Sequence, residues 1–259
     1  MNYRKVGHIK AKYRELVKKE PYNGTHYVKS LFWNLRYCIV CASTEIEIDR
    51  SFKDIHCVNK LDKILPYGII AYRQRSSYGQ KNRQWKSSLG GVWLSVAFPW
   101  SRNISLPLAV IEGLCLQLEK MNVHVQFKWP NDLVVNNRKL IGILPRLIIR
   151  SNGSYIAKVG IGLNVRNITP PEGINLFDIT RSCSICLDLI VAKVLRGLDW
   201  SVHNAHEQEF IRQSVEKRLI GLGKPFPCKG SIWKIIGLEI NGGIILSRRN
   251  QIIVYKRSF

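Results

Sequence analysis

The stretch from Phe127 to Leu144 constrains the fold of this 259-residue chain more than any other segment. Apolar and polar residues alternate from Val123 to Phe127, which is the period of a half-buried strand. Pro130 ends that strand, because proline cannot donate a hydrogen bond to a sheet. The sequence therefore predicts a turn at Asn131 and Asp132.

Two short apolar segments follow this turn, at residues 133–135 and 140–144. They are joined by Asn136-Asn137, and asparagine tolerates the positive φ angles that a tight hairpin turn needs. The segments are thus expected to pair as a β-hairpin. Such a hairpin returns Lys139 towards Asp132.

This hairpin gathers two cations, Lys128 and Lys139, beside the amide of Asn131 and the carboxylate of Asp132. Those groups suit a ligand that carries phosphate together with a bound metal ion. Turn chemistry alone explains most of the same residues, with Lys139 as an ordinary exposed strand end. Spacing by itself leaves both interpretations open.

The charge of the chain favours contact with anions. Forty Lys and Arg residues against eighteen Asp and Glu residues give a net charge of +22, which fits an acidic or polyanionic partner. The basic residues are spread along the chain without an Arg-rich arm or interleaved aromatic residues, so a dedicated nucleic-acid role is disfavoured. No apolar run reaches the roughly 20 residues of a membrane span and the first residues do not resemble a secretory signal, so a cytoplasmic protein is expected. A disulfide framework is not expected among the seven cysteines, and the two Cys-x-x-Cys pairs, Cys38 with Cys41 and Cys183 with Cys186, are expected to be buried free thiols.

The remaining segments predict a mixture of helices and strands. Residues 1–33 form a basic extension with a helix from Val6 to Lys19, too short for a three-helix DNA-binding domain. Ser105 is expected to cap a helix, and Ser201 another that follows a break in a helical region. Further predicted elements are a hairpin around Asn152-Gly153 and a small β-barrel of short strands after Lys224.

Three motifs carry a resemblance to the biotin protein ligases. They read Lys-Trp-Pro-Asn-Asp-Leu at 128–133, Arg-Lys-Leu-Ile-Gly-Ile-Leu at 138–144 and Gly-Ile-Gly-Leu-Asn-Val at 160–165. All three stand in the order and at the distances found in that family. The resemblance covers roughly residues 35–250.

The resemblance implies an α+β fold in two parts. A catalytic domain related to class II aminoacyl-tRNA synthetases, with a mixed sheet and helices, is expected at 34–221. An SH3-like β-barrel domain is expected at 222–259, and residues 1–33 are left as the N-terminal extension.

The biotin site of the family maps onto two segments. Ser43 and Thr44 match the hydroxyl turn that holds the ureido ring, and Gln74 matches the glutamine that meets biotin. Glu45 stands where the family has asparagine, and Arg146 stands where it usually has an acidic residue.

The family's Gly-Arg-Gly-Arg-x-Gly-Arg-x-Trp loop, which shields the reactive adenylate, corresponds to a poorly matching segment. Gly79, Arg83 and Trp85 fit the pattern. Four residues depart from it, namely Ser77, Tyr78, Gln80 and Asn82. The loss of glycines and of fixed cations is expected to change how tightly this loop closes.

The nucleotide site follows from the same resemblance. Lys139 is the expected catalytic cation and also meets biotin, while Lys128 and Arg83 assist at the phosphates and Asp132 orients Mg²⁺ or the incoming amine. The adenylate is expected to contact a further set of residues, Trp85, Asn131, Gly162 and Asn164.

The implied reaction has two steps. The biotin carboxylate attacks the α-phosphorus of ATP, and a lysine of the biotin carboxyl carrier domain of acetyl-CoA carboxylase then displaces AMP. ATP, biotin and Mg²⁺ are the expected substrates and cofactor. A lipoate or octanoyl transferase of the same superfamily, a binding protein that no longer transfers biotin and a nucleic-acid-binding protein remain as alternatives. The oligomeric state is not predicted.

Overall fold

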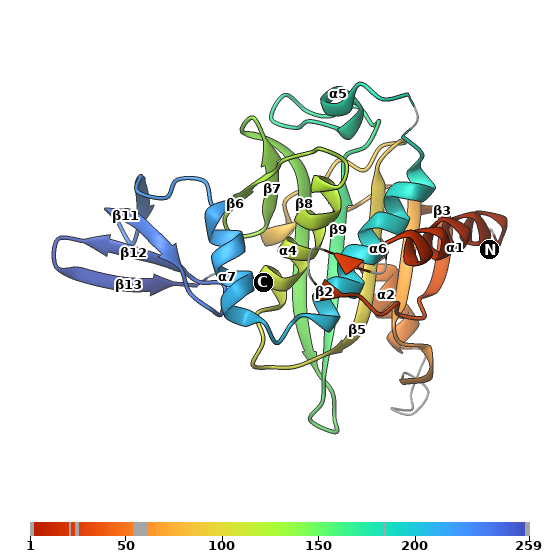
Figure 1. The fold of residues 1–259 in the computed structure, drawn as a ribbon, viewed down its shortest axis with the longest axis horizontal. Coiled ribbons are helices and arrows are strands. Elements are labelled where there is room, and N and C mark those ends of the chain that lie inside the picture. Colours follow the sequence, from red (N-terminus) through yellow and green to blue (C-terminus); the bar gives the residue numbers. More distant parts are fainter. Residues whose placement is uncertain (1–2, 21, 24–25, 54–61, 184, 257–259) are drawn as a thin grey trace.

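The computed structural model describes residues 3–20, 22–23, 26–53, 62–183 and 185–256. The parts of the predicted domains at 1–2, 54–61, 184 and 257–259 lie outside the described residues. Over the described part, a large sheet, a group of helices and a small sheet pack together (Figure 1). Within that part, every helix is too short or too polar to cross a bilayer.

A seven-stranded mixed sheet forms the centre of the molecule, in the order β3-β4-β5-β9-β8-β7-β6. Only β3 and β4 run parallel; the other neighbours are antiparallel. The strands are β3 (Asn34–Cys41), β4 (Tyr67–Gln74), β5 (Val92–Trp100), β6 (Gln126–Lys128), β7 (Asp132–Val135), β8 (Arg138–Ile149) and β9 (Tyr155–Leu163).

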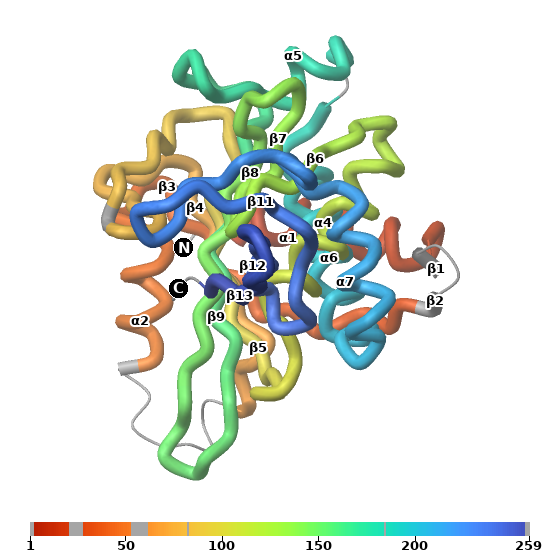
Figure 2. The backbone as a smooth tube through the Cα atoms, turned by 90° about the vertical axis from the view of Figure 1, so that its left-hand side faces the viewer, coloured from red at the N-terminus to blue at the C-terminus, as the bar shows by residue number. Residues whose placement is uncertain are grey.

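Helices cover both faces of this sheet unequally. Figure 2 shows α2 on one side of β8 and β9, and α4, α6 and α7 on the other. The bounds are α1 (Tyr3–Lys19), α2 (Thr44–Lys53), α4 (Leu106–Glu119), α5 (Leu176–Thr180), α6 (Leu187–His203) and α7 (Gln208–Lys217), with a 3-10 turn η1 (Gln80–Asn82). The main apolar core lies on the side of α4 and α6, where Val159 and Ile161 of β9 point. The opposite side of β9, with its glycines, is left to the candidate site.

The hairpin predicted from the sequence is confirmed. β7 and β8 are antiparallel neighbours, and Asn136 and Asn137 have φ angles of 51° and 60°. The strand predicted from Val123 is shorter than expected, since β6 begins only at Gln126, where it finds β7 to pair with. The hairpin at 143–162 is also confirmed, with a longer connection than two residues.

The N-terminal helix is part of the core, although the sequence indicated only an extension. α1 buries Val6, Ile9, Tyr13 and Leu16 among the residues of the main core and packs against α6. Two short strands follow it, β1 (Tyr22–Asn23) and β2 (His26–Tyr27).

The predicted cap at Ser201 is wrong. Ser201 lies within α6, fully buried, and its hydroxyl donates to the carbonyl oxygens of Gly197 and Ala109. The helix ends after His203 instead. The Ser201 hydroxyl is not available to cap another helix, because it is hydrogen-bonded between α4 and α6. Ser105 precedes α4 as predicted, but its side chain makes no capping hydrogen bond.

The C-terminal part is an antiparallel sheet of four strands in sequence order, which confirms the predicted C-terminal β domain. Within the described residues its first and last strands are not paired with each other, so the sheet is open. The strands are β10 (Pro225–Cys228), β11 (Ser231–Leu238), β12 (Ile244–Arg248) and β13 (Gln251–Tyr255). The sheet closes over Trp129 of the central domain, whose ring lies 6.1 Å from that of Phe226 and 5.6 Å from that of Tyr255. The indole nitrogen of Trp129 also donates to the carbonyl of Gly242. Trp129 thus joins the C-terminal sheet to the central sheet.

Candidate active site

Asp132 and Lys139 meet at the start of the β7–β8 hairpin, as predicted. The Lys139 ammonium lies 2.7 Å from the Asp132 carboxylate, and both side chains are partly exposed. The same ammonium lies 4.7 Å from the centre of the Trp85 ring, a cation–π distance. The carboxylate of Asp132 and the indole of Trp85 therefore hold the ammonium of Lys139 in place beside the β7–β8 hairpin.

Beside the Lys139 ammonium, glycines of β8 and β9 leave the backbone of the sheet without covering side chains. Gly142 and Gly162 are paired across the two strands. A Cβ atom on Gly162 would lie 2.7 Å from the Trp85 ring, and one on Gly142 would lie 2.9 Å from it. The indole of Trp85 thus rests on the glycine backbone, on a surface that accepts flat groups.

Replacing Gly162 with alanine is expected to lift Trp85 from this surface, because the added methyl group and the ring cannot occupy the same space. Tryptophan fluorescence should then shift to longer wavelength and become more accessible to acrylamide. Gly7→Ala is the matched control, because a Cβ there meets no atom within 4 Å. An unchanged spectrum in the Gly162→Ala protein would contradict this placement of the indole.

The hydroxyl turn and Gln74 lie together, also as predicted. The Oε1 atom of Gln74 accepts from the backbone nitrogen and the hydroxyl of Thr44, at 2.7 and 3.1 Å. Ser43 and Thr44 are buried, and Ser43 Oγ accepts from the backbone nitrogen of Glu45 at 3.3 Å. This end of the site is a preorganised polar patch between α2 and β4.

Three serines that the sequence did not single out extend this patch. Ser95 of β5 shares a 2.8 Å hydrogen bond with the Thr44 hydroxyl, and Ser87 accepts from Gln74 at 2.8 Å. Ser77 bonds both Ser87 and the carbonyl of Trp85, each at 2.6 Å. The sequence signal for Ser95 was its position as a serine within the apolar run 92–98. Ser77 was noted only as a departure from the loop pattern, yet it ties that loop down.

The other predicted residues divide into two groups. Asn164 is buried next to the hairpin and donates to the Lys139 carbonyl at 3.2 Å, and Asn131 donates to the Ile143 carbonyl at 2.7 Å. Lys128 and Arg83 are exposed, with Lys128 opposite Asp132 in the strand register. The structure therefore brings Asn131 and Asn164 into the hairpin framework and leaves Lys128 and Arg83 on its rim.

The six described cysteines are free, as predicted, but the prediction that both Cys-x-x-Cys pairs are buried is wrong: Cys38 and Cys41 are half-buried at the edge strand β3, and Cys183 and Cys186 are exposed before α6. The seventh, Cys57, lies outside the described residues. Burial raises the pKa of Cys41 to about 12, so its thiol stays protonated at neutral pH. It is thus no nucleophile for this site.

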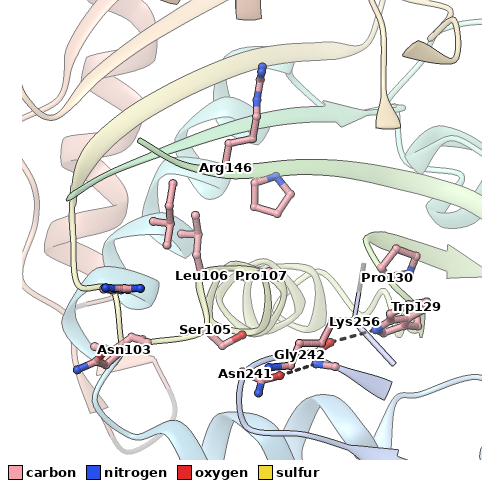
Figure 3. A pocket seen from close by; sticks show the side chains of 15 residues that line it. Asn103, Ser105, Leu106, Pro107, Trp129, Pro130, Arg146, Asn241, Gly242 and Lys256 are labelled. Atoms are coloured by element: carbon pink, nitrogen blue, oxygen red, sulfur yellow. Dashed lines mark hydrogen bonds between the residues drawn. The ribbon is translucent and has the colours of Figure 1, made fainter. Parts of the chain in front are cut away.

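A cavity of about 430 Å³ lies elsewhere, between the start of α4 and the C-terminal sheet. Its lining includes Asn103, Ser105, Trp129 and Lys256, and Figure 3 shows the Arg146 side chain pointing away from it. Arg146 points towards Glu45 on the other face of the sheet. This cavity is therefore separate from the candidate site.

Comparison with known proteins agrees with this geometry. Residues 66–164 match the Biotin/lipoate A/B protein ligase family. The chain is 32% identical to the bifunctional ligase/repressor BirA of Bacillus subtilis over 128 residues, which cover 45% of this chain and 38% of that protein. It is 31% identical to biotin–protein ligase 2 of Arabidopsis thaliana over 123 residues, 43% of this chain and 37% of that protein. The matches thus span well under half the length of these relatives.

Solved structures extend the likeness to most of the chain. The biotin protein ligase of Aquifex aeolicus, in complex with biotin and ATP, aligns with a TM-score of 0.69 at 24% identity over 85% of this chain and 94% of that one. The Leishmania major biotin protein ligase with biotinyl-5-AMP aligns with a TM-score of 0.58 at 19% identity over 86% and 99%. Residues 66–164 therefore belong to the part of the chain that matches the biotin/lipoate A/B protein ligase family, and the chain has the mixed α+β fold of the biotin protein ligases.

Proposed function

We propose that the protein is an ATP-dependent biotin ligase that forms biotinyl-5′-AMP and transfers biotin to a lysine of a biotin carboxyl carrier domain. The observation that supports this most directly is the Lys139 ammonium, held by Asp132 and Trp85 beside the bare glycine surface of β8 and β9. The ligands named for the Aquifex and Leishmania structures, biotin with ATP and biotinyl-5-AMP, fit the same chemistry.

The first step joins two anions, so it needs fixed positive charge where negative charge develops. An oxygen of the biotin carboxylate attacks the α-phosphorus, and the bond from that phosphorus to pyrophosphate breaks. Lys139 is placed to stabilise the charge on the α-phosphoryl oxygens. Lys128 and Arg83, exposed on the rim, assist at the departing phosphates.

The second step consumes the mixed anhydride. The neutral amine of the carrier lysine attacks the acyl carbon, AMP leaves with the bonding electrons, and a proton is lost from the new amide nitrogen. The carboxylate of Asp132, next to Lys139, can orient the attacking amine. Ser43, Thr44 and Gln74 hold the ureido ring, while Trp85, Asn131, Gly162 and Asn164 surround the adenosine.

Mg²⁺ would enter with ATP. The described residues contain no cluster of three or more His, Cys, Asp or Glu side chains able to hold a metal by themselves. Mg²⁺ commonly binds through one or two carboxylates, substrate phosphates and water, and Asp132 can supply one such carboxylate. The residues thus fit a metal that neutralises phosphate charge as part of the nucleotide.

The partner we propose is the carrier domain of acetyl-CoA carboxylase, with the reaction in the cytoplasm. A Helicobacter pylori protein called biotin acetyl coenzyme A carboxylase synthetase has the same fold, with a TM-score of 0.60 at 16% identity. The net charge of +22 suits an acidic carrier surface.

Incubation with biotin, ATP, Mg²⁺ and a biotin carboxyl carrier domain tests the proposal, with the intact mass of the carrier as readout. We expect one biotin on the carrier, and none on a carrier whose acceptor lysine is replaced by arginine. Pyrophosphate release without a labelled carrier would mean activation without transfer. No biotin-dependent pyrophosphate at all would overturn the proposal and favour a binding protein or, if octanoate or lipoate is used instead, an acyl transferase.

A further inference from the structure

Glu45 and Arg146 depart from the family pattern separately in the sequence, and the structure joins them. The guanidinium of Arg146, on β8, donates to the Oε2 atom of Glu45, near the start of α2. The two residues are 101 positions apart. The two departures are therefore one feature. Glu45, at the position of the family's asparagine, forms an ion pair with Arg146, at the position where the family usually has an acidic residue.

The pair belongs to a buried charge cluster. The Lys158 side chain is only 2% exposed, lies 3.5 Å from Glu45 Oε2 and also pairs with Asp49. Burial works to lower the pKa of Arg146, but Glu45 and Tyr78 outweigh it and raise that pKa above its usual value. Two acids, Glu45 and Asp49, and two bases, Arg146 and Lys158, thus lie together behind the polar patch.

One carboxylate oxygen of Glu45, Oε1, makes none of the ion pairs in this cluster. The side chain is 5% exposed, and its Oε1 atom has no hydrogen-bond partner among the described residues. That oxygen faces Gly160, where an added Cβ would lie 2.9 Å from it. Gly160 pairs with Ser95, whose hydroxyl meets Thr44, so Oε1 lies at the same end of the site as the polar patch.

The neighbouring polar groups are already occupied. Thr44 is bonded to Gln74 and Ser95, and the Gln74 amide donates to Ser87. A buried carboxylate oxygen left unpaired is costly, whereas one that receives an N–H donor is stabilised. The atom at this end of the site that still needs a donor is thus Glu45 Oε1.

We propose that Glu45 determines substrate specificity by accepting a hydrogen bond from an N–H group of the acid that is activated, and that Arg146 positions it. The inference rests on the proposed ligase function and adds a residue that discriminates biotin from other carboxylic acids. An alkyl or dithiolane acid offers no donor and leaves Oε1 unpaired, so it is rejected.

Two variants test the contact. Glu45→Met removes the acceptor, and Glu45→Met combined with Arg146→Met does so while keeping the charges of the cluster balanced, so the second remains informative if the first does not fold. Biotin-dependent pyrophosphate release is measured with biotin, with biotin methylated on either ureido nitrogen, and with lipoate. Asp49→Asn is the matched control, because Asp49 pairs with the same Lys158 but is 43% exposed.

The wild type should prefer biotin to at least one methylated form, and both variants should raise the KM for biotin roughly 10- to 100-fold while kcat changes less. The preference over that methylated form should disappear in both variants and persist in Asp49→Asn. If the wild type releases pyrophosphate with biotin but the variants keep its KM and its preference, this inference alone is overturned. If the wild type releases none with biotin, the proposed function fails first.

Discussion

Replacing Lys139 with alanine is expected to lower biotin-dependent pyrophosphate release by about 10²- to 10³-fold, which is the range for loss of one preorganised donor to developing charge. The ammonium is fixed by Asp132 at 2.7 Å and stands 4.7 Å from the centre of the Trp85 ring. A cation fixed in this way needs little reorganisation when charge develops at the α-phosphate. Its loss should therefore appear in kcat as well as in kcat/KM.

The same substitution should leave the fold intact. The Lys139 and Asp132 side chains are 31% and 21% exposed, so their ion pair stabilises the protein by at most about 1 kcal/mol. Urea unfolding should show that change and no more. Lys217→Ala is the matched control, since Lys217 is exposed at the end of α7 and has no role in the proposed mechanism, so the rate should not change. Near-normal turnover of the Lys139→Ala protein would remove Lys139 from the mechanism.

The parts of this site that were predictable from the sequence depend on local chemistry. Asn136-Asn137 specifies the turn of the hairpin, and the turn determines that Lys139 returns to Asp132 seven residues away. The pattern of the loop before Trp85 was also readable as a departure from the family. The sequence did not show that another contact holds this loop in place of the missing family residues. Ser77 fixes the loop by a hydrogen bond to the hydroxyl of Ser87, ten residues away.

Contacts between distant segments were not predictable from periodicity. Nothing in the local pattern links Glu45 to Arg146, because their contact depends on how α2 lies against the sheet. The N-terminal helix is a different case. Its buried residues Val6, Ile9, Tyr13 and Leu16 have helical spacing, so the sequence did indicate an apolar face. The partner of that face, α6, begins more than 160 residues later.

Replacing Asp199 with alanine is expected to lower the free energy of unfolding by about 3–5 kcal/mol, the range for breaking a buried ion pair. Asp199 is fully buried in α6 and accepts from Tyr13 at 2.7 Å, from Trp33 at 2.9 Å and from Arg196 at 2.9 Å. Without the carboxylate, the buried guanidinium of Arg196 and the donors on Tyr13 and Trp33 lose their common acceptor. Urea unfolding measures the loss, and faster amide hydrogen exchange in α1 would locate it.

The control for this effect is an exposed ion pair on the same N-terminal helix. Glu15 pairs with Lys19 within α1 at 2.8 Å, and the two side chains are 45% and 69% exposed. Glu15→Ala should therefore leave the free energy of unfolding nearly unchanged. Equal losses in the two variants would mean that the buried network contributes no more than an exposed ion pair.

The pH dependence of the Asp199 effect separates its charge from its shape. Burial raises the pKa of Asp199 from 3.8 to about 6, although Tyr13, Trp33 and Arg196 oppose the shift. Between these values the folded protein binds more protons than the unfolded chain, so the contribution of this group to stability falls by about 2 kcal/mol as the pH rises from 4 to 7. Asp199→Asn cannot titrate. The difference in unfolding free energy, wild type minus Asp199→Asn, should thus decrease over that range, whereas a constant difference would show that folding does not raise the pKa of Asp199.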